Sequence, residues 1–291
     1  MIRALIALLL LMGTAACRQP EAAGPQAAPK PALWAIEGPR GTTAGWLFGT
    51  IHALPAGAQW ETPALTRAIE RAGVLVVEVR DLDPERTAAV LARLARDAPG
   101  PPLAERLPPA ARRELAERLE RQGVSSSQFD PLETWAAALA LSRLGDTASA
   151  ANGVDRALIV RFAGRPIAEL EGAAAQLAIF DALPERDQRR LLAAVLAEEG
   201  DPATAARALA QAWLAGDLAQ LGRATRRGLL ADPALYEALA AGRNRAWAGR
   251  LARLLHSGQR PLVAVGTAHM LGPDGLPALL AAQGYRVRRI Q

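Results

Sequence analysis

The stretch Trp46–His52, WLFGTIH, ends an apolar run with a Gly-Thr-x-His unit, and Pro261–His269, PLVAVGTAH, does the same near the other end of the chain. Each apolar run is typical of a buried β-strand, and the glycine marks the point where that strand ends. Glycine permits close backbone approaches, so strand-Gly-x-x-His can present an imidazole at the rim of a sheet. The sequence therefore predicts two similar loops at strand ends.

The duplication of this unit matters more than either copy alone. A single Gly-x-x-His is a weak signal, because such spacings arise by chance. The chain contains only three histidines, however, and His52 and His269 close the two units. This pattern favours one shared site, although a repeat can also be a relic of fold symmetry. The third, His256, lies where a helix is expected to end, a place that the helix dipole favours.

The N-terminal segment has the features of an export signal. Residues 1–17 combine a positive start, a short apolar core and small residues, and the core is shorter than the roughly 20 residues of a membrane-spanning helix. Cys17, the only cysteine, excludes an intramolecular disulfide and lies where a lipobox would place it, with Thr14 in place of the usual leucine. An ordinary signal peptide with an incidental cysteine is the alternative. We expect a lipoprotein of the cell envelope, in the periplasm and anchored to the outer membrane through lipidated Cys17.

The rest of the chain suits one sizeable domain. Residues 18–31 are proline-rich among alanines and predict a flexible tether, which leaves residues 32–291 for the fold. The net charge is +5, but arginines and glutamates alternate along the predicted helix Pro108–Gln122, as on a solvated face. We therefore expect no nucleic-acid partner.

The N-terminal module alternates strands and a helix. Leu33–Glu37 and Thr43–Phe48 predict a hairpin, and Ala64–Ala72 predicts a short helix. Val74–Val77 is entirely apolar, as expected of a strand covered on both faces, and it ends in Glu78. A strand, a helix and a strand in succession favour a parallel crossover, which would place His52 and Glu78 at the same sheet edge.

Glu78 needs an explanation, because an ionised carboxylate in an apolar site costs several kcal/mol unless it is paired or bound to a cation. The alternative is that Glu78 is the first exposed loop residue or pairs with Arg80. Glu171 is in a similar position, because Pro166–Glu171 also looks like a strand that ends in a carboxylate.

The middle of the chain, from Pro84 to about Gly258, is almost entirely helical in its periodicity. The predicted helices are Pro84–Arg96, Pro108–Gln122, Pro131–Leu144, Val154–Ala163, Pro184–Glu199, Pro202–Ala215, Leu218–Leu230, Pro233–Ala240 and Asn244–Leu255. A helix over Gly275–Gln283 and a strand over Tyr285–Ile290 follow the second histidine unit. The fold class is therefore α/β, with a central mixed, partly parallel sheet built from the N- and C-terminal segments and a large helical insertion or lid at about 84–258.

Several of these segments together resemble the TraB/GumN family. They are Leu33–Ile36, Leu47–Pro55, Val76–Val79, Leu170–Glu171, Arg243–Trp247 and Val263–Gly272. That family is similar to the Tiki proteins, which are metal-dependent proteases with paired Gly-x-x-His motifs and a glutamate, and it looks related to a clan of erythromycin-esterase-like and haem-associated ChaN-like proteins.

The resemblance implies a set of site residues. It points to His52, Glu78 and His269 as the catalytic and metal-binding residues, with Glu171 and Arg243 as weaker additions. Two imidazoles and a carboxylate suit a divalent ion such as Zn, Mn or Co, which would activate a water molecule. Without metal, one histidine could act as a general base that Glu78 orients. In the family, Arg243-Asn244 is a recurrent pair; the alternative is that a helix starts here with Asn244 as its cap.

The sequence lacks a Gly-x-Ser-x-Gly elbow, a His-Glu-x-x-His motif and a spare cysteine, so water is the expected nucleophile. The resemblance implies a metal-dependent, peptidase-like hydrolase that acts on an envelope peptide or another small substrate. The alternative is a non-catalytic envelope module that binds a peptide, a polysaccharide or a haem-like ligand. In a third interpretation the histidines only stabilise loop geometry.

Overall fold

The structure, a computed structural model, describes residues 28–291 except 40, 96–99, 145–151 and 198–201. The predicted signal peptide, Cys17 and most of the predicted tether lie outside the described residues. Within the described part of the chain, no helix is both long and apolar enough to cross a membrane.

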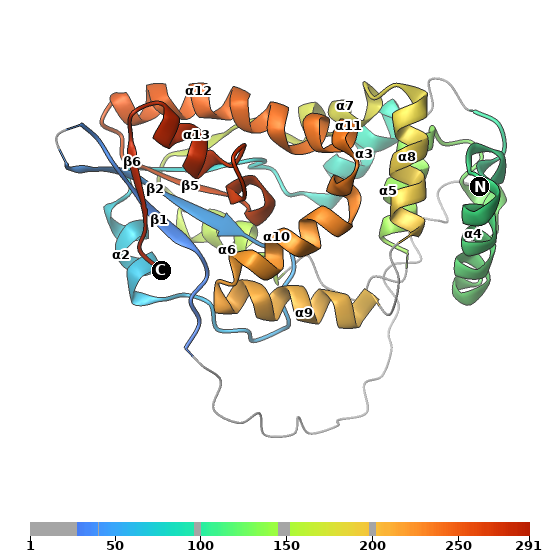
Figure 1. The fold of residues 1–291 in the computed structure, drawn as a ribbon, viewed down its shortest axis with the longest axis horizontal. Coiled ribbons are helices and arrows are strands. Elements are labelled where there is room, and N and C mark those ends of the chain that lie inside the picture. Colours follow the sequence, from blue (N-terminus) through green and yellow to red (C-terminus); the bar gives the residue numbers. More distant parts are fainter. Residues whose placement is uncertain (1–27, 40, 96–99, 145–151, 198–201) are drawn as a thin grey trace.

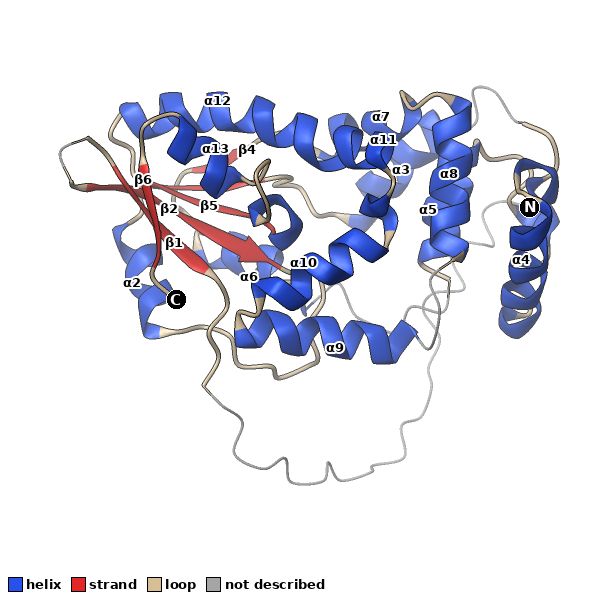
Figure 2. Cartoon of the chain, viewed as in Figure 1, coloured by secondary structure: helices blue, strands red, loops and turns tan. Residues whose placement is uncertain are grey.

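A six-stranded sheet, drawn in red in Figure 2, forms the centre of the fold, and its strands come from both ends of the chain. They are β1 (Leu33–Glu37), β2 (Thr43–Thr50), β3 (Val74–Val77), β4 (Ile167–Glu169), β5 (Pro261–Gly266) and β6 (Arg286–Arg289), in the order β4-β3-β5-β2-β1-β6. Strands β4, β3, β5 and β2 are parallel, while β1 is antiparallel to both β2 and β6. The predicted mixed, partly parallel sheet is confirmed, and the C-terminal β5 lies between β2 and β3.

Helices cover both faces of this sheet (Figure 1). On one face, α2 (Pro63–Arg71), α6 (Val154–Arg161) and α9 (Pro202–Ala215) pack against inward side chains such as Phe48 and Leu75. On the other face, α12 (Gly242–His256) and α13 (Leu276–Ala282) pack against side chains such as Val263 and Val265. Thr62 caps α2, as Thr62 Oγ1 accepts a hydrogen bond from Leu65 N at 3.2 Å.

The helical insertion builds a second apolar core beside the sheet, on the right of Figure 1. Its helices are α3 (Pro84–Leu94), the 3₁₀ turn Leu103–Arg106, α4 (Pro109–Gln122), the 3₁₀ turn Ser126–Gln128, α5 (Thr134–Ser142), α7 (Ala173–Asp181) and α8 (Glu185–Leu196). The sequence interpretation missed α7, because its apolar residues surround the helix instead of forming one stripe.

The chain returns to the sheet through α10 (Leu218–Arg227), the 3₁₀ turn Leu229–Ala231 and one long helix. Two separate helices, Pro233–Ala240 and Asn244–Leu255, were predicted there, and this prediction was wrong. Helix α11 (Pro233–Tyr236) continues through a π-helical turn, Glu237–Ala241, directly into α12. Asn244 is therefore inside a helix and is not its cap. Such π-turns often occur at functional sites, because they rotate the side chains that follow.

Candidate functional site

The two Gly-Thr-x-His units lie side by side at the carboxyl ends of β2 and β5. In the parallel register, Gly49 pairs with Val265 and Thr50 with Gly266. The Thr267 hydroxyl donates a hydrogen bond to the Thr50 carbonyl at 2.8 Å. A Cβ atom added to Gly49 would lie 2.9 Å from Thr267 Oγ1 and 3.3 Å from Thr267 Cα. The first glycine is therefore required for the contact between the two units.

Because of this close contact, we expect Gly49→Ala to destabilise the protein. We expect the free energy of unfolding to fall by about 1–3 kcal/mol, because the added methyl group overpacks the contact with Thr267. Gly249→Ala is the matched control: Gly249 lies inside α12 with nothing within 4 Å of an added Cβ. There, higher helix propensity should raise stability by up to about 1 kcal/mol. Urea unfolding of both variants measures this difference, and equal stability of the two variants would refute it.

His52 is held by a carboxylate that the sequence interpretation missed. Its Nδ1 lies 2.9 Å from Asp155 Oδ2, and the Thr50 hydroxyl donates to Asp155 Oδ1 at 2.6 Å. The hydrogen bond to Asp155, with the negative charge of that carboxylate, raises the pKa of His52 to about 9. His52 itself is open to water, with 76% of its side chain exposed, so the ion pair adds little stability. The pair instead keeps His52 protonated at neutral pH, with Nε2 free.

His269, in the 3₁₀ turn Thr267–Met270, has the opposite environment. It is buried, its ring centroid lies 4.6 Å from that of Trp247, and its Nδ1 lies 2.6 Å from Asn244 Oδ1. Asn244 Nδ2 donates to the Asp274 carbonyl at 2.8 Å, so Asn244 Oδ1 is the acceptor for a proton on His269 Nδ1. Burial lowers the pKa of His269 to about 4, helped by the charge of Arg243. His269 is therefore neutral at pH 7, with its lone pair on Nε2.

Arg243 connects the two buried glutamates. Its Nη2 donates to Glu78 Oε2 at 2.8 Å, and Nε and Nη2 donate to the two Glu171 oxygens at 2.9 and 2.8 Å. The remaining nitrogen, Nη1, donates to the Leu239 carbonyl of the π-turn at 2.9 Å and lies 3.3 Å from His269 Nε2. The π-turn thus supplies a hydrogen bond that fixes Arg243.

Glu78 is neither an exposed loop residue nor the partner of Arg80, the two alternatives that the sequence left open. Only 8% of it is exposed, and its Oε1 accepts the Gly266 N–H at 2.8 Å. Burial would raise the pKa of the Glu78 carboxyl, but positive charge on His269 when protonated, that on Arg243 and the Gly266 N–H together hold it below its ordinary value. Since His269 is neutral at pH 7, the charge of Arg243, the Gly266 N–H and the charge of His52 are the groups that favour the ionised form of Glu78 there.

The site residues converge above Gly266. A Cβ atom added there would lie 3.3 Å from Glu78 Oε1, 3.9 Å from His52 Nε2 and 3.9 Å from His269 Cδ2. The structure therefore brings together His52, Glu78 and His269, with Arg243 linking Glu171 to them. The residues that sequence reasoning missed are Asp155, Gln176, which donates to Glu78, and the partners of Arg243 and His269 on α12, Asn244 and Trp247.

A divalent cation would need His52, Glu78 and His269 as ligands. The donor types fit, and the oxygen partners at both Nδ1 atoms are typical of histidines that bind metal through Nε2. Among the described residues, however, no three His, Cys, Asp or Glu side chains are grouped so that they could hold a metal ion. Arg243 occupies Glu78 Oε2 and faces His269 Nε2, where its charge would repel a metal cation. This arrangement does not fit a three-ligand centre, and metal binding stays a prediction.

Comparison with protein families assigns the chain to one family. The model of the TraB/PrgY/gumN family matches residues 32–289, nearly the whole chain. The protein belongs to the TraB/PrgY/gumN family. The match covers every strand of the sheet and all the site residues described above. Searches among curated proteins and among solved structures found no match to this TraB/PrgY/gumN protein.

Proposed function

We propose that this TraB/PrgY/gumN protein is a hydrolase in which water attacks a peptide or another small substrate between His52 and His269. The observation that carries the proposal is the contrast between the two histidines, which meet at Gly266 but have opposite protonation states at neutral pH. Two titratable groups whose environments separate their pKa values are the usual arrangement of a catalytic acid and a catalytic base.

The distance between two acceptors supports a position for the attacking water. His269 Nε2 and Glu78 Oε1 lie 4.0 Å apart, and a water molecule there would replace the long 3.3 Å contact of Arg243 Nη1 with His269 Nε2. One water molecule at about 2.8 Å from each atom can donate hydrogen bonds to both. This arrangement would orient a lone pair of the water toward a carbonyl carbon and give its proton an acceptor as the bond forms.

His52 supplies the complementary function. Asp155 holds the proton of His52 Nδ1, so a second proton on Nε2 faces the site and can stabilise the developing oxyanion or protonate the leaving group. Arg243, Asn244 and Asp155 are positioning residues in this scheme, because each acts through a histidine or through Glu78. Neither histidine needs a bound metal for these roles.

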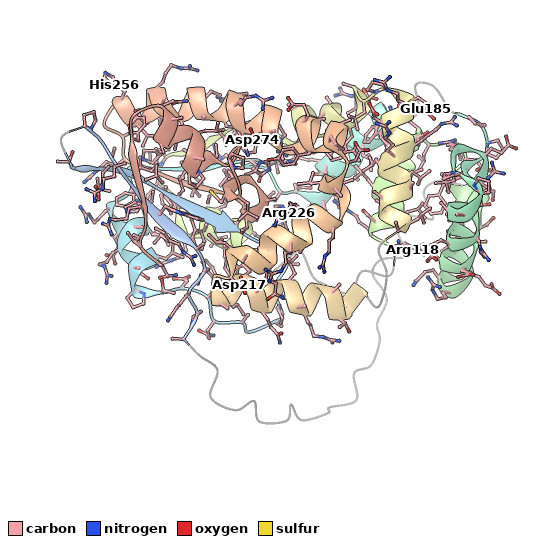
Figure 3. All side chains as sticks on the ribbon, in the orientation of Figure 1. Arg118, Glu185, Asp217, Arg226, His256 and Asp274 are labelled. Carbon is pink, nitrogen blue, oxygen red and sulfur yellow. The ribbon has the colours of Figure 1, made fainter. Side chains whose placement is uncertain are left out.

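The direct test is cleavage of a defined mixture of synthetic peptides, followed by mass spectrometry, with and without EDTA or added Mn²⁺. We expect cleavage by the wild type and its loss in His52→Gln. His256→Gln is the matched control, because His256 is the exposed last residue of α12, at the outer edge of the molecule in Figure 3. Full activity of His52→Gln would overturn the proposal, and loss with EDTA that Mn²⁺ restores would establish metal dependence.

The two pKa values also predict a pH profile. Hydrolysis should be constant over the range in which His52 is protonated and His269 is neutral. It should fall below about pH 4 as His269 gains a proton and above about pH 9 as His52 loses one. Asp155→Asn removes the group that raises the pKa of His52. The pH at which hydrolysis falls on the alkaline side should therefore move toward about 6.5, the pKa of an unperturbed histidine. An unchanged alkaline limb of kcat/KM in this variant would contradict the assignment.

A non-catalytic binding module is the second candidate. The ion pairs of Arg243 with Glu78 and Glu171 favour it, because they already satisfy both carboxylates. Peptide binding in a titration without any cleavage, lost in His52→Gln, would favour this function over hydrolysis.

We also propose that the protein is exported and anchored to the outer membrane through Cys17, which the sequence of residues 1–17 supports. Cys17→Ser should move the protein from the membrane fraction to the soluble periplasmic fraction. Unchanged membrane association of the variant would contradict lipid anchoring.

A further inference from the structure

Arg156, in the first turn of α6, lies beside the histidine site. The residue before it, Asp155, is the carboxylate that holds His52. The Arg156 side chain reaches the segment that follows β3, because its Nη2 donates to the Leu82 carbonyl at 2.7 Å. Leu82 is four residues after Glu78. Arg156 therefore connects the helix that holds His52 with the segment that carries Glu78.

The Arg156 guanidinium is incompletely hydrogen-bonded. A guanidinium has five N–H donors, and the bond to Leu82 is the only one that Arg156 makes with a described residue. Its Nε is buried, and it is the one buried side-chain nitrogen or oxygen without a partner in the described part of the chain. A buried donor without an acceptor is costly and rare in proteins, so it calls for a functional explanation.

The charge of Arg156 also has no counter-ion among the residues that the structure describes. The preceding residue, Asp155, is already engaged by the first histidine unit. Asp81 and Asp83, on either side of the carbonyl that Arg156 binds, pair with Arg86 at 2.6 and 3.9 Å, and Asp83 also caps α3. A positive charge with free donors is thus left at the edge of the histidine site.

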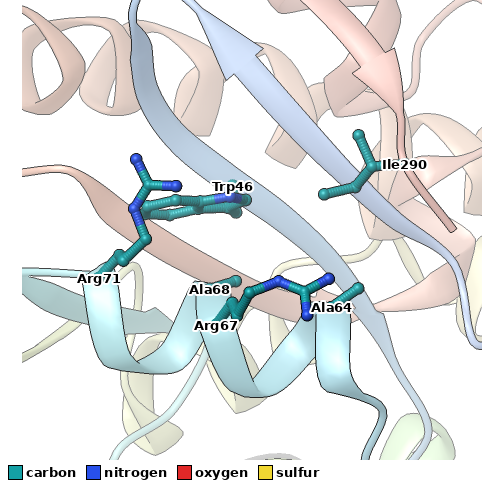
Figure 4. Close-up of a pocket in the computed structure, with 6 residues that line it drawn as sticks. All are labelled: Trp46, Ala64, Arg67, Ala68, Arg71 and Ile290. Carbon is teal, nitrogen blue, oxygen red and sulfur yellow. The ribbon is translucent and has the colours of Figure 1, made fainter.

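Other arginines differ from Arg156 in this respect. Arg106, which is 1% exposed, donates to three backbone carbonyls. Arg67 and Arg71 line a hollow beside α2 (Figure 4), but both are exposed, so water can satisfy their donors. Arg156 is partly buried, and neither solvent nor a described residue reaches its Nε. The missing acceptor therefore points to a ligand.

We propose that Arg156 binds a carboxylate of the substrate, so that the histidine site selects acidic peptides. This inference rests on the proposed peptide hydrolase and adds its class of substrate. A peptide carries carboxylates in acidic side chains and at its C-terminus, and one guanidinium can hold a carboxylate through two parallel hydrogen bonds. Nε gains its acceptor when the guanidinium turns toward the ligand. Because Arg156 directly follows Asp155, the bound carboxylate lies within a few residues of the scissile bond.

The test compares peptides that differ in a single carboxylate. One series carries glutamate or glutamine at one to four residues from the scissile bond, on either side, with both termini blocked. A further pair differs only in a free or an amidated C-terminus. At one position we expect KM of the wild type to be roughly tenfold lower, or more, with the carboxylate than without it, because a charge-assisted hydrogen bond is made. The value of kcat should be similar, since the bond is equally strong in the ground state and the transition state.

In Arg156→Gln the ratio of the two KM values should be close to one. Arg156→Glu should reverse the preference and favour lysine over glutamate at the same position. Arg161→Gln is the matched control, because it removes the same charge from the exposed last residue of α6, and it should keep the wild-type ratio. Preference within the first series would identify an acidic side chain as the bound group, and preference within the second pair a C-terminal carboxylate.

Two outcomes would overturn the proposal. One is an equal KM ratio in the wild type and Arg156→Gln, and the other is an equal loss of preference in Arg161→Gln. A lower urea midpoint of Arg156→Gln with an unchanged KM ratio would show that Arg156 has only a structural role.

Equilibrium binding separates this proposal from the hydrolase itself. Fluorescence anisotropy of labelled peptides with a reduced, non-cleavable bond gives dissociation constants that do not depend on turnover, and peptides that the protein does not cleave can be used unmodified. Preference for acidic peptides that Arg156→Gln abolishes, without any cleavage by the wild type, would support the role of Arg156 and refute the hydrolase. Cleavage of acidic and neutral peptides with equal KM would support the hydrolase and refute the role of Arg156.

Discussion

Arg243→Ala is expected to destabilise the protein by about 3–5 kcal/mol, because it leaves two buried carboxylates without their shared cation. Arg243 is the only ion-pair partner of Glu171 and the only arginine paired with Glu78 among the described residues. Both glutamate side chains are at most 12% exposed, so water cannot replace the guanidinium. Urea unfolding at pH 7 measures the effect as a lower midpoint at unchanged slope.

The stability difference between Arg243→Ala and the wild type should be smaller at acidic pH. Without Arg243, burial favours the neutral form of Glu78, so the variant folds with a carboxylate that takes up a proton more readily than in the unfolded chain. Stability of Arg243→Ala relative to the wild type should therefore improve as the pH falls from 7 toward about 4.5.

Arg245→Ala is the matched control for this prediction. Arg245 is two residues further on α12, and it pairs with Glu237 in an ion pair whose side chains are 49% and 58% exposed. An exposed pair of this kind contributes about 0–1 kcal/mol. Equal destabilisation by Arg243→Ala and Arg245→Ala would show that the buried network is not what holds this edge of the sheet.

His52→Gln and His269→Gln should each reduce kcat/KM for peptide hydrolysis by about 10²–10⁴-fold, which is the usual contribution of a general acid or base. The informative variant is the double one. Because the proposed acid and base act in one transition state, removal of both should cost little more than removal of either. The measurement is kcat/KM of the two single variants and the double variant on one peptide.

The kcat/KM values of these three variants distinguish a hydrolase from a protein in which the histidines have only a structural role. Losses that multiply in the double variant would mean that the histidines act independently, which contradicts a shared site. Lower thermal stability at unchanged kcat/KM would mean that the motifs serve only to hold the loops. His256→Gln is again the control variant, for both kcat/KM and thermal stability.

Much of the sheet could be predicted because its strands have strong local patterns. Val74–Val77 is uniformly apolar and is buried on both faces, and Thr62 with Pro63 marks the start of α2. The sequence also contains the reason why the two histidines meet, because parallel strands end at one edge of a sheet. That β5 lies between β2 and β3 is a property of long-range pairing, which no local pattern encodes.

The missed site residues share a physical reason. Asp155 occupies the first turn of α6, where an acidic residue ordinarily complements the helix dipole, so its bond to His52 left no local signal. Asn244 was interpreted as a possible cap because the π-turn that continues the helix has no sequence signature. Only tertiary packing distinguishes these roles from the ordinary ones.

Two copies of one motif form a single site, in which one histidine holds its proton tightly and the other loses it readily. A histidine NMR titration measures this difference, with the signals assigned by His52→Gln and His269→Gln. We expect His52 to titrate near 9 and His269 near 4. Titration of both residues together near about 6.5, the value for an unperturbed histidine, would contradict it.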